Sequence, residues 1–478
     1  MSLDKLLSAT KDVADIIRET NGFVSVLTHY DADGLASGGA TARFLSHLGK
    51  KFLIRSTAAL TDKVLNSFFC VKSGLYIIQD MGSGELSIVI NKWREAAENS
   101  MLIIIDHHKL ETDYIEEEAD FILLNPEIYG YDGGKTGCTS ILTSLVGYFG
   151  TDMKDDYFIE VGLVGATGDM QLNNSIEGVN KYLYDIAVER NIIRHEREFV
   201  FFTAKNLPIH KAIVWNMVPY IPGFSGRDDI GLNIVRKSGI KYRDKEGKYL
   251  TVADLSDDEK VKLLEIITKY IASKGIEEVS TDDLLVDVYY LPNEKDPYLQ
   301  TTTEFSNILS SCGRMDREET GILLSMGVRK GGKVLDEAKK IFEKRRRTLA
   351  KYLDTADSVV RVIENRLAII DMRGKDFSHK FSGTISTLYS RSPNYRGNII
   401  VVLAYMDDEG IKLSARAPRE MVDKGLDLSK IMRAISGKLG GRGGGHNVAA
   451  GALVPMEADN IIIDEIVRTV KEALESGG

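Results

Sequence analysis

The first part of the chain alternates short apolar runs with longer segments of helical periodicity. Between about Gly22 and Gly168 the apolar runs read FVSVLT, KFLIRS, LYIIQ, MLIII and FILL. They are continuous rather than alternating, which is typical of strands that are covered on both faces of a parallel sheet. Helical segments such as LASGGATARFLSHLG and GELSIVINKWREAAENS separate them. The pattern predicts an α/β domain with a parallel, doubly wound sheet.

The pattern changes after residue 225. Residues 226–300 are charge-rich, carry no catalytic motif and are expected to form an accessory insert. Residues 301–332 return to compact, small-residue-rich sequence, which we assign to the end of the first domain, residues 1–225. A highly charged helix is expected at 333–360 as a connector. Strand-like RLAIIDM, NIIVVLAYMD and GIKLSARAP, followed by a closing helix, predict a smaller α/β domain at 361–478.

Composition restricts the class of protein. The chain has 478 residues and a formal charge of −9, which argues against a polybasic nucleic-acid binder but not against a nuclease, because a metal site carries its own cations. The three cysteines, Cys70, Cys138 and Cys312, cannot build a disulfide framework, so we expect a cytoplasmic protein. No apolar run approaches the roughly 20 residues that span a bilayer, so no membrane partner is expected.

Acidic and imidazole side chains follow the ends of several predicted elements. The candidate residues are His29, Asp31 and Asp33 after VSVLT, Asp80 after LYIIQ, Asp106, His107 and His108 after MLIII, and Asp169 after VGLVGATG. The carboxyl ends of parallel strands meet at one edge of a sheet, where ligands bind. A single His-x-Asp-x-Asp also suits a loop of Asx turns, but four such places in one domain predict a shared site.

The donor types in this set indicate its chemistry. Carboxylates with imidazoles and no thiolate suit Mn²⁺ or Mg²⁺ rather than structural zinc. There are enough ligands for two ions, and two ions about 4 Å apart are the usual device for in-line displacement at phosphorus. A remaining histidine can donate a proton to the leaving oxygen. The sequence therefore predicts metal-dependent phosphoester hydrolysis.

The glycine-rich GGRGGGHNVAAG suggests a second kind of site. Adjacent glycines allow backbone N–H groups to approach an anion closely, and Arg442 and His446 would add positive charge. The alternative is a flexible glycine turn. Ser414 and Arg416 in KLSARAP are candidate phosphate contacts on a neighbouring strand. Arg314 in SSCGRMD is another candidate, with a structural ion pair as its alternative.

These motifs resemble those of a known family. HYDADG, QDMGSG, DHHK and ATGD are similar to the four motifs of the DHH phosphoesterase superfamily, and GGRGGGHNVAAG resembles the glycine-rich motif of the DHHA1 domain. The combination resembles the RecJ-type single-strand exonucleases. EFSNILSSCGRMDREETGILLSMG is similar to the segment that closes the DHH domain in archaeal RecJ-like proteins, including the GINS-associated nuclease. The resemblance covers most of the chain and is weakest at 226–300.

The resemblance implies a role for each candidate residue. One Mn²⁺ would be held by His29, Asp31 and Asp80, and the other by Asp33, Asp80, His107 and Asp169, with Asp80 bridging. His108 would face the scissile phosphate and Asp106 would orient its neighbours. Nucleotide phosphate would be held between the domains by Ser414, Arg416, Gly444, Gly445 and His446, with Arg314 contacting DNA. No metal position is substituted, whereas a eukaryotic helicase subunit related to RecJ has lost such ligands and is a scaffold.

The expected function is therefore a Mn²⁺-dependent exonuclease, with Mg²⁺ as the alternative ion, that acts on single-stranded DNA in replication or repair. RNA as a substrate and the direction of digestion stay open. One alternative is a phosphodiesterase for cyclic dinucleotides or short oligonucleotides, although such relatives are shorter than this chain. Another is a replisome subunit bound by GINS and the replicative helicase, through a charge-rich surface around Arg243 to Glu278.

Overall fold

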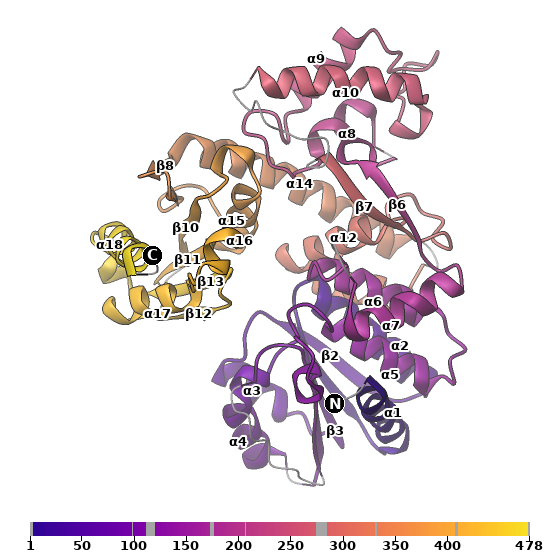
Figure 1. The fold of residues 1–478 in the computed structure, drawn as a ribbon. Coiled ribbons are helices and arrows are strands. Elements are labelled where there is room, and N and C mark those ends of the chain that lie inside the picture. Colours follow the sequence, from indigo (N-terminus) through magenta and orange to yellow (C-terminus); the bar gives the residue numbers. More distant parts are fainter. Residues whose placement is uncertain are drawn as a thin grey trace. The chain divides into compact units, whose positions relative to one another are not determined.

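The structure is a computed structural model that describes residues 3–97, 99–110, 120–172, 176–205, 207–273, 284–329, 332–406 and 410–476. The chain divides into two compact units. The first comprises Met1–Arg197 and Asp287–Arg345, and the second comprises Glu198–Val286 and Arg346–Gly478. Each unit is described by itself, with its elements labelled as in Figure 1.

The first unit is built on a five-stranded parallel sheet. Its strands are β1 (Val24–His29), β2 (Phe52–Thr57), β3 (Leu75–Gln79), β4 (Met101–Ile105) and β5 (Phe121–Leu124), in the order β2-β1-β3-β4-β5. Every neighbouring pair is parallel. Each predicted apolar run forms one of these strands, so the predicted α/β fold with a parallel sheet is confirmed.

Both faces of this sheet are covered by helices. Alternate residues of β3 show this, because Leu75 and Ile77 join one apolar core while Tyr76 and Ile78 join another. The first core includes α1 (Leu3–Glu19), α2 (Ala32–His47), α5 (Thr139–Gly150) and α6 (Tyr157–Gly168), and the second includes α3 (Asp62–Phe69) and α4 (Leu86–Ala96). Burial on both faces explains why the strands are apolar without alternation.

The later part of the first unit packs against α2. It contains α7 (Gly178–Glu189), α12 (Thr302–Arg314) and α13 (Glu318–Ser325), and the paired strands β6 (Arg194–Phe199) and β7 (Leu285–Tyr290) lie at its boundary. A Cβ at Gly39 would lie 2.3 Å from Ser325 Cβ, so the small residues of α2 allow α13 to approach closely. The segment expected to complete the first domain therefore packs on it directly.

Arg43 of α2 joins three parts of this unit. Its Nε and Nη2 donate to the two carboxylate oxygens of Asp155, at 2.5 and 3.0 Å, and its Nη1 donates to the carbonyl of Met326 at 3.0 Å. Burial opposes ionisation of Asp155, but the hydrogen bonds and charge of Arg43 outweigh it and lower the pKa of that carboxyl. The pair thus stabilises the ionised form of Asp155 in the folded protein.

The first part of the second unit has its own apolar core. Its elements are a 3₁₀ turn at Val200–Phe202, α8 (Ile209–Trp215), α9 (Asp228–Ser238), a 3₁₀ turn at Val252–Asp254 and α10 (Asp257–Ala272). Phe201, Phe202 and Ile213 belong to the same core as Val235 and Leu263. For this reason the contacts divide the chain at Glu198, earlier than the expected start of the insert at 226. The expected domain boundaries stay a prediction, and residues 274–283 of that insert lie outside the described residues.

The rest of the second unit contains a six-stranded mixed sheet and the end of a long helix. The helix is α14 (Lys333–Val359), as predicted. The strands are β8 (Val360–Ile363), β9 (Leu367–Asp371), β10 (Ile399–Met406), β11 (Gly410–Arg416), β12 (Arg442–Gly445) and β13 (Ala449–Val454), in the order β12-β13-β11-β10-β9-β8. Only the β9–β10 pair is parallel in this described sheet. Helices α17 (Leu428–Lys438) and α18 (Ile462–Ser476) share an apolar core with it, and α15 (Ser382–Ser390) contacts β10 and β11.

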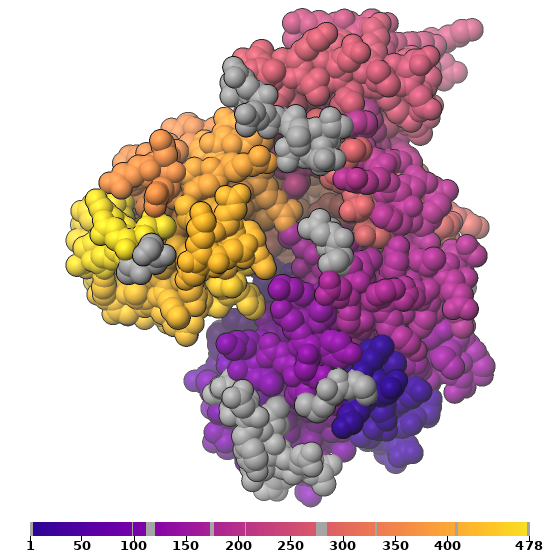
Figure 2. All heavy atoms as spheres, in the orientation of Figure 1, coloured from indigo at the N-terminus to yellow at the C-terminus, as the bar shows by residue number. Residues whose placement is uncertain are grey.

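The remaining short elements complete the two units. They are α16 (Arg419–Asp423) and the 3₁₀ turns Ser83–Glu85, Pro126–Tyr129, His379–Phe381, Pro393–Tyr395 and Met456–Ala458. Figure 2 shows that α18, coloured yellow, presents one side at the protein surface. Among the helices of the described residues, none has both the length and the apolar character that crossing a membrane requires.

We predict that Asp155→Asn lowers the free energy of unfolding by about 1–2 kcal/mol at pH 7, because it removes one charged partner of Arg43. The Asp155 pKa is lowered on folding, so its contribution is complete above the unfolded pKa of about 4 and disappears as pH falls through the folded pKa. Urea denaturation at pH 7 and pH 3 measures both effects. Asp185→Asn, which breaks an exposed pair with Lys181, is the control and should change stability by less than about 0.5 kcal/mol. Equal midpoints for wild type and Asp155→Asn at pH 7 would refute the prediction.

Candidate metal centre

The carboxyl edge of the parallel sheet gathers eight of the candidate residues. His29 ends β1, Asp31 caps α2 and Asp33 lies in its first turn, Asp80 follows β3, Asp106, His107 and His108 follow β4, and Asp169 caps the C-terminus of α6. Their donor atoms form three groups within 4.8 Å: His29, Asp31 and Asp80; Asp33, His107 and Asp169; and Asp80, His107 and His108. Residues separated by up to 140 positions (29 to 169) therefore meet at one edge.

Asp80 lies between the first two groups. Its carboxylate is 2% exposed, with one oxygen 3.5 Å from His29 Nδ1 and the other 3.3 Å from His107 Nε2. Neither oxygen accepts a hydrogen bond from any described residue, and His29 Nδ1 also has no hydrogen-bond partner there. Burial of a carboxylate without donors is costly. The oxygen and nitrogen donors around it fit a hard divalent cation, which would offset that cost.

The first group is fixed by the start of α2. Asp31 accepts a hydrogen bond from Gly34 N at 3.0 Å and lies 3.1 Å from His29 Nδ1. Burial would lower the pKa of His29, but Asp31 and Asp80 raise it well above its usual value. The reverse holds for Asp31, whose pKa is lowered by His29 despite burial. A Cβ at Gly34 would lie 2.4 Å from His29 O, so a glycine is required at this turn.

The second group is fixed by His107 and by α5. His107 Nδ1 lies 2.8 Å from the carbonyl of Gly133, which places the ring proton on Nδ1. This leaves the lone pair of Nε2, 3.1 Å from Asp169 Oδ2, for a metal ion. The two oxygens of Asp33 accept hydrogen bonds from Thr139 N and Ser140 N, each at 3.0 Å. Burial, followed by the charges of Asp80 and Asp169, raises the pKa of Asp33. The residues of this group thus repel one another unless a cation or protons intervene.

Asp106 and His108 make different contacts from the other six residues. The Asp106 carboxylate is fully buried and accepts hydrogen bonds from Ser83 N and His107 N, each at 2.8 Å, and from His108 N at 3.2 Å. It also contacts His108 Nδ1 at 2.8 Å. Burial opposes protonation of His108, but Asp106 outweighs it and raises its pKa to about 9. His108 is therefore protonated at neutral pH, with its side chain 44% exposed.

Several residues that hold His107 in place were not predicted. Gln171 Nε2 donates to the carbonyl of Gly133 at 2.8 Å, and Asn180 Nδ2 donates to Gln171 Oε1 at 2.7 Å. A Cβ at Gly133 would lie 1.9 Å from His107 O, so this position also requires glycine. The one sequence signal for Gln171 is its place two residues after Asp169. A further polar contact supports the same loop, because Asn125 Nδ2 donates to His108 O at 2.9 Å.

Arg314 lies beside the first group. It is the last residue of α12, and its guanidinium is 6.0 Å from the ring of Tyr30, which separates His29 from Asp31 in the sequence. A Cβ at Gly313 would lie 1.7 Å from Tyr30 O, so α12 ends in close contact with this loop. The structure thus brings Arg314 to the loop that carries His29 and Asp31, while its contact with DNA stays a prediction.

The other predicted substrate residues meet in the second unit. Ser414 on β11 and Gly444 on β12 both pair with Gly451 of β13, so they lie in one row across the sheet. The others of this set are Arg416, paired with Ala449, Gly445, paired with Ala450, and His446, whose N–H donates to Ala449 O at 2.8 Å. Ser414 Oγ lies 2.8 Å from Ser382 Oγ, and Arg416 Nε donates to Thr387 Oγ1 at 3.1 Å.

The glycine-rich segment is an edge strand rather than a loop. Gly443 of β12 lies against α17, where a Cβ would be 2.7 Å from Met432 O. Its neighbour Gly445 has a φ of +132°, a conformation that side chains disfavour. The absence of side chains therefore allows β12 to pack closely on α17 and to turn at His446. Phosphate binding at this strand stays a prediction.

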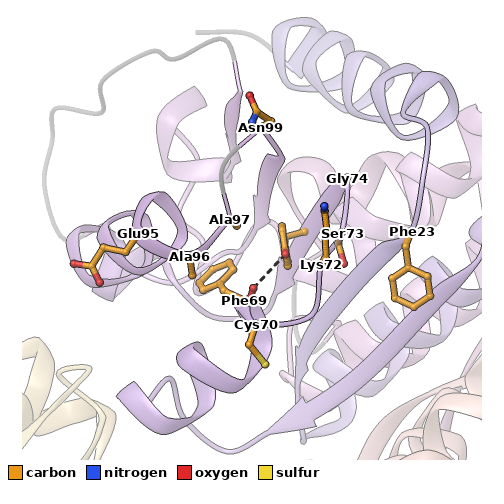
Figure 3. Close-up of a pocket in the computed structure, with 11 residues that line it drawn as sticks. Phe23, Phe69, Cys70, Lys72, Ser73, Gly74, Glu95, Ala96, Ala97 and Asn99 are labelled. Atoms are coloured by element: carbon orange, nitrogen blue, oxygen red, sulfur yellow. Dashed lines mark hydrogen bonds between the residues drawn. The ribbon is translucent and has the colours of Figure 1, made fainter.

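A separate pocket of about 750 Å³ lies at the opposite, amino-terminal edge of the parallel sheet (Figure 3). Its lining includes Phe69, Cys70 and Ser73, and the Tyr76 hydroxyl donates to Phe69 O at 3.3 Å. All three groups of side chains that could hold a metal ion, among the described residues, lie at the carboxyl edge instead. The carboxyl edge is therefore the candidate active site.

Comparison with known proteins gives matches along the whole chain. Residues 23–158 match the family model of the DHH family, N-terminal domain, and residues 377–476 match that of the DHHA1 domain. An uncharacterized protein from Methanocaldococcus jannaschii is 28% identical over 99% of this chain and 98% of its own length. CDC45 from Entamoeba histolytica has a similar fold (TM-score 0.62, 8% identity, 98% of both chains). So does an exonuclease RecJ bound to manganese (TM-score 0.55, 14% identity, 98% of this chain and 95% of that one).

We predict that Gln171→Leu weakens Mn²⁺ binding about ten- to hundredfold, because the carbonyl that orients His107 loses its second donor and Asn180 loses its partner. Calorimetric titration with Mn²⁺ measures this change, and thermal unfolding of the same samples reports any loss of stability. Thr143→Val is the matched control, since it removes a buried hydroxyl that donates to Thr139 O and accepts from Gln79 Nε2 but makes no hydrogen bond to a candidate metal ligand. Equal Mn²⁺ affinities for Gln171→Leu and Thr143→Val would contradict the positioning role.

Proposed function

We propose that this chain, which matches the DHH and DHHA1 family models and has a RecJ-like fold, belongs to the DHH/DHHA1 phosphoesterase superfamily and is a metal-dependent exonuclease that hydrolyses single-stranded DNA or RNA. The observation that carries the proposal is Asp80. Its two buried oxygens have no hydrogen-bond donor among the described residues and face two separate groups of donors. A bridging carboxylate of this kind supports a site for two ions, with Mn²⁺ favoured and Mg²⁺ as the alternative.

The ligands of the two ions follow from the donor groups. His29, Asp31 and Asp80 would hold one ion, and Asp33, Asp80, His107 and Asp169 the other. Bound ions supply a water nucleophile at neutral pH and offset charge on the phosphoryl oxygens. His29 and His107 must be neutral to bind, so their raised pKa values mean that ions displace protons.

His108 and Asp106 provide an acid beside this site. Asp106 fixes the ring through Nδ1, which leaves Nε2 as the nitrogen that can meet a substrate oxygen. With a pKa of about 9 the imidazolium donates a hydrogen bond to an anionic phosphate at neutral pH. It can also give its proton to a leaving oxygen, which is the role we propose for it.

Nucleotide contacts are proposed within each unit, taken by itself. In the second unit, Ser414, Arg416 and His446 offer donors and positive charge beside the amides of Gly444 and Gly445. In the first unit, Arg314 lies over Tyr30 beside His29. An arginine against an aromatic ring suits a phosphate with its adjoining base. Single-strand preference is proposed from the resemblance to RecJ-type exonucleases.

We predict that Asp80→Ala abolishes cleavage, with a loss of at least about a thousandfold, because it removes the carboxylate shared by both ions. The assay is digestion of end-labelled single-stranded DNA and RNA with Mn²⁺. Labels at either end report the direction of digestion in the same experiment. Asp62→Ala, an exposed carboxylate at the start of α3, is the control and should digest at the wild-type rate. Digestion by folded Asp80→Ala at the wild-type rate would disprove the two-ion site.

The small-substrate alternative makes a different prediction for the wild-type protein. An exonuclease that holds a strand through several phosphates should have a higher kcat/KM for a 20-nucleotide strand than for a dinucleotide, because added contacts lower the barrier from free substrate. A phosphodiesterase for cyclic dinucleotides or short oligonucleotides should show the reverse order. Steady-state rates on both substrates under identical Mn²⁺ decide between these two functions.

Docking to GINS and the replicative helicase is a second candidate function, favoured by the likeness in fold to CDC45. Within the segment Arg243 to Glu278, of which residues 274–278 lie outside the described residues, α10 begins with Asp257, Asp258 and Glu259 and exposes 58% of Val261. Such a mixed acidic and apolar face suits a protein partner. Co-purification of GINS with a Val261→Glu variant tests it, and undiminished recovery would oppose a role for this face.

A further inference from the structure

A turn at residues 241–249, closed by one isolated antiparallel bridge and here called the cationic hairpin, projects four basic side chains. Its sequence KYRDKEGKY contains Lys241, Arg243, Lys245 and Lys248 against two acidic residues. All four cations are exposed, and the three lysines form no ion pair with any described residue. This local excess of positive charge stands out in a chain of net charge −9.

The cationic hairpin has a defined conformation. Arg243 pairs with Tyr249 in an antiparallel bridge, and Leu250 N donates to Tyr242 O at 3.0 Å. The Asp244 carboxylate accepts from Glu246 N and Lys248 N, each at 2.9 Å, so this acidic group is used to hold the turn. Because the turn is fixed, its lysines are displayed without a large ordering cost.

The same hairpin carries a stack of planar groups. The Arg243 guanidinium lies 4.0 Å from the Tyr249 ring centroid and donates to the Tyr249 hydroxyl at 2.5 Å. The ring of His210, which is 6% exposed, also contacts the Tyr249 ring, with 4.4 Å between the two centroids. Tyr242 lies 6.3 Å from Tyr249 with its ring tilted by 28°. His210 supports Tyr249 from the interior, and Arg243 is the exposed member of the stack.

Arg243 is well suited to meet a base. Its Nη1 donates to Gly247 O at 3.0 Å and its Nη2 to the Tyr249 hydroxyl, so the guanidinium keeps its orientation and its outer face can stack on a nucleobase. Burial, together with the charges of Lys211 and Arg243, lowers the pKa of His210 even though Asp228 opposes this, so His210 is neutral and adds no charge. The positive potential of the surface therefore comes from lysine and arginine.

We propose that the cationic hairpin is a second binding surface for the single strand, where its lysines bind phosphates and Arg243, stacked on Tyr249, packs on a base. This inference rests on the proposed nuclease function and adds a contact outside the metal centre. An acidic protein partner would satisfy the lysines too, but the planar stack under an exposed arginine favours nucleic acid. In Figure 2 the elements around this hairpin, coloured pink, lie at the protein surface.

The test is the salt dependence of strand binding. Fluorescence anisotropy of labelled 20-nucleotide deoxythymidine and uridine strands, with EDTA to prevent cleavage, gives Kd between 50 and 200 mM salt for the full chain. Loss of three phosphate contacts in Lys241→Ala/Lys245→Ala/Lys248→Ala should reduce the log–log salt slope by about 2, at about 0.7 per contact for single strands. Raising the salt from 50 to 200 mM lowers affinity by some factor, and that factor should be about twenty times smaller in the triple variant than in the wild type, for both strands.

The planar stack is tested separately from the charge. Arg243→Lys keeps the charge, so we expect an unchanged salt slope but about fivefold or more weaker binding, since an ammonium cannot stack as a guanidinium does. With Mn²⁺ present, the triple lysine variant should cleave a four-nucleotide strand at the wild-type rate and a 20-nucleotide strand more slowly.

The control is Lys5→Ala/Lys51→Ala/Lys154→Ala, which removes the same charge from three exposed lysines of the first unit. It should keep the wild-type slope. A wild-type slope in the triple hairpin variant would overturn the proposal, and so would an acidic partner that binds through these lysines while strand binding is unchanged. If the wild-type protein binds neither strand, the proposed nuclease function fails instead, so the two failures are distinct.

Discussion

The carboxyl edge of the first unit is organised around a buried carboxylate, Asp80, that accepts no hydrogen bond from the described residues. Asp80 leaves the end of β3 with a φ of +61° and places both oxygens between imidazoles instead of amides. Desolvation of that charge costs free energy, and the surrounding carboxylates add repulsion. Parallel strands, the start of α2 and the end of α6 all converge on this point. A divalent cation is the simplest partner for such a group, so binding of one would stabilise this edge.

The number of backbone amide hydrogen bonds that each aspartate accepts distinguishes the roles of the acidic residues at this edge. Asp106 accepts three amide hydrogen bonds and Asp33 two, while Asp80 accepts none from the described residues. Asp106, with three amide donors and the His108 ring, is already satisfied and fixes the loop that supplies them, whereas Asp33, with one amide on each oxygen, keeps further lone pairs for an ion. A carboxylate without donors is available to an ion. The hydrogen bonds thus distinguish Asp106, which orients His108, from Asp80, although both are buried aspartates that follow a strand.

Among the described residues of the second unit there is no group of side chains that could hold a metal ion. Its notable features are small residues and planar side chains. The glycines of β12 allow that strand to pack on α17 beside Ser414 and Arg416. The insert has a core of its own, and its hairpin presents cations over an aromatic stack. Together with the candidate ion site of the first unit, these two features are the kinds of contact that the proposed nuclease function would require for a flexible strand.

The sequence alone determined the five strands, the parallel sheet and the residues at its carboxyl edge. This was possible because buried strands are recognisable as short continuous apolar runs, and because the carboxyl ends of parallel strands lie at one edge of the sheet. Gln171 is marked only by its place two residues after Asp169, and nothing local marks Asn180 or Gly133, which also hold His107, nor the start of the insert core at Val200. The stack of Arg243, Tyr249 and His210 also joins residues distant in sequence. Only tertiary packing decided these contacts, because hydrogen bonds and ring contacts depend on distances that periodicity does not encode.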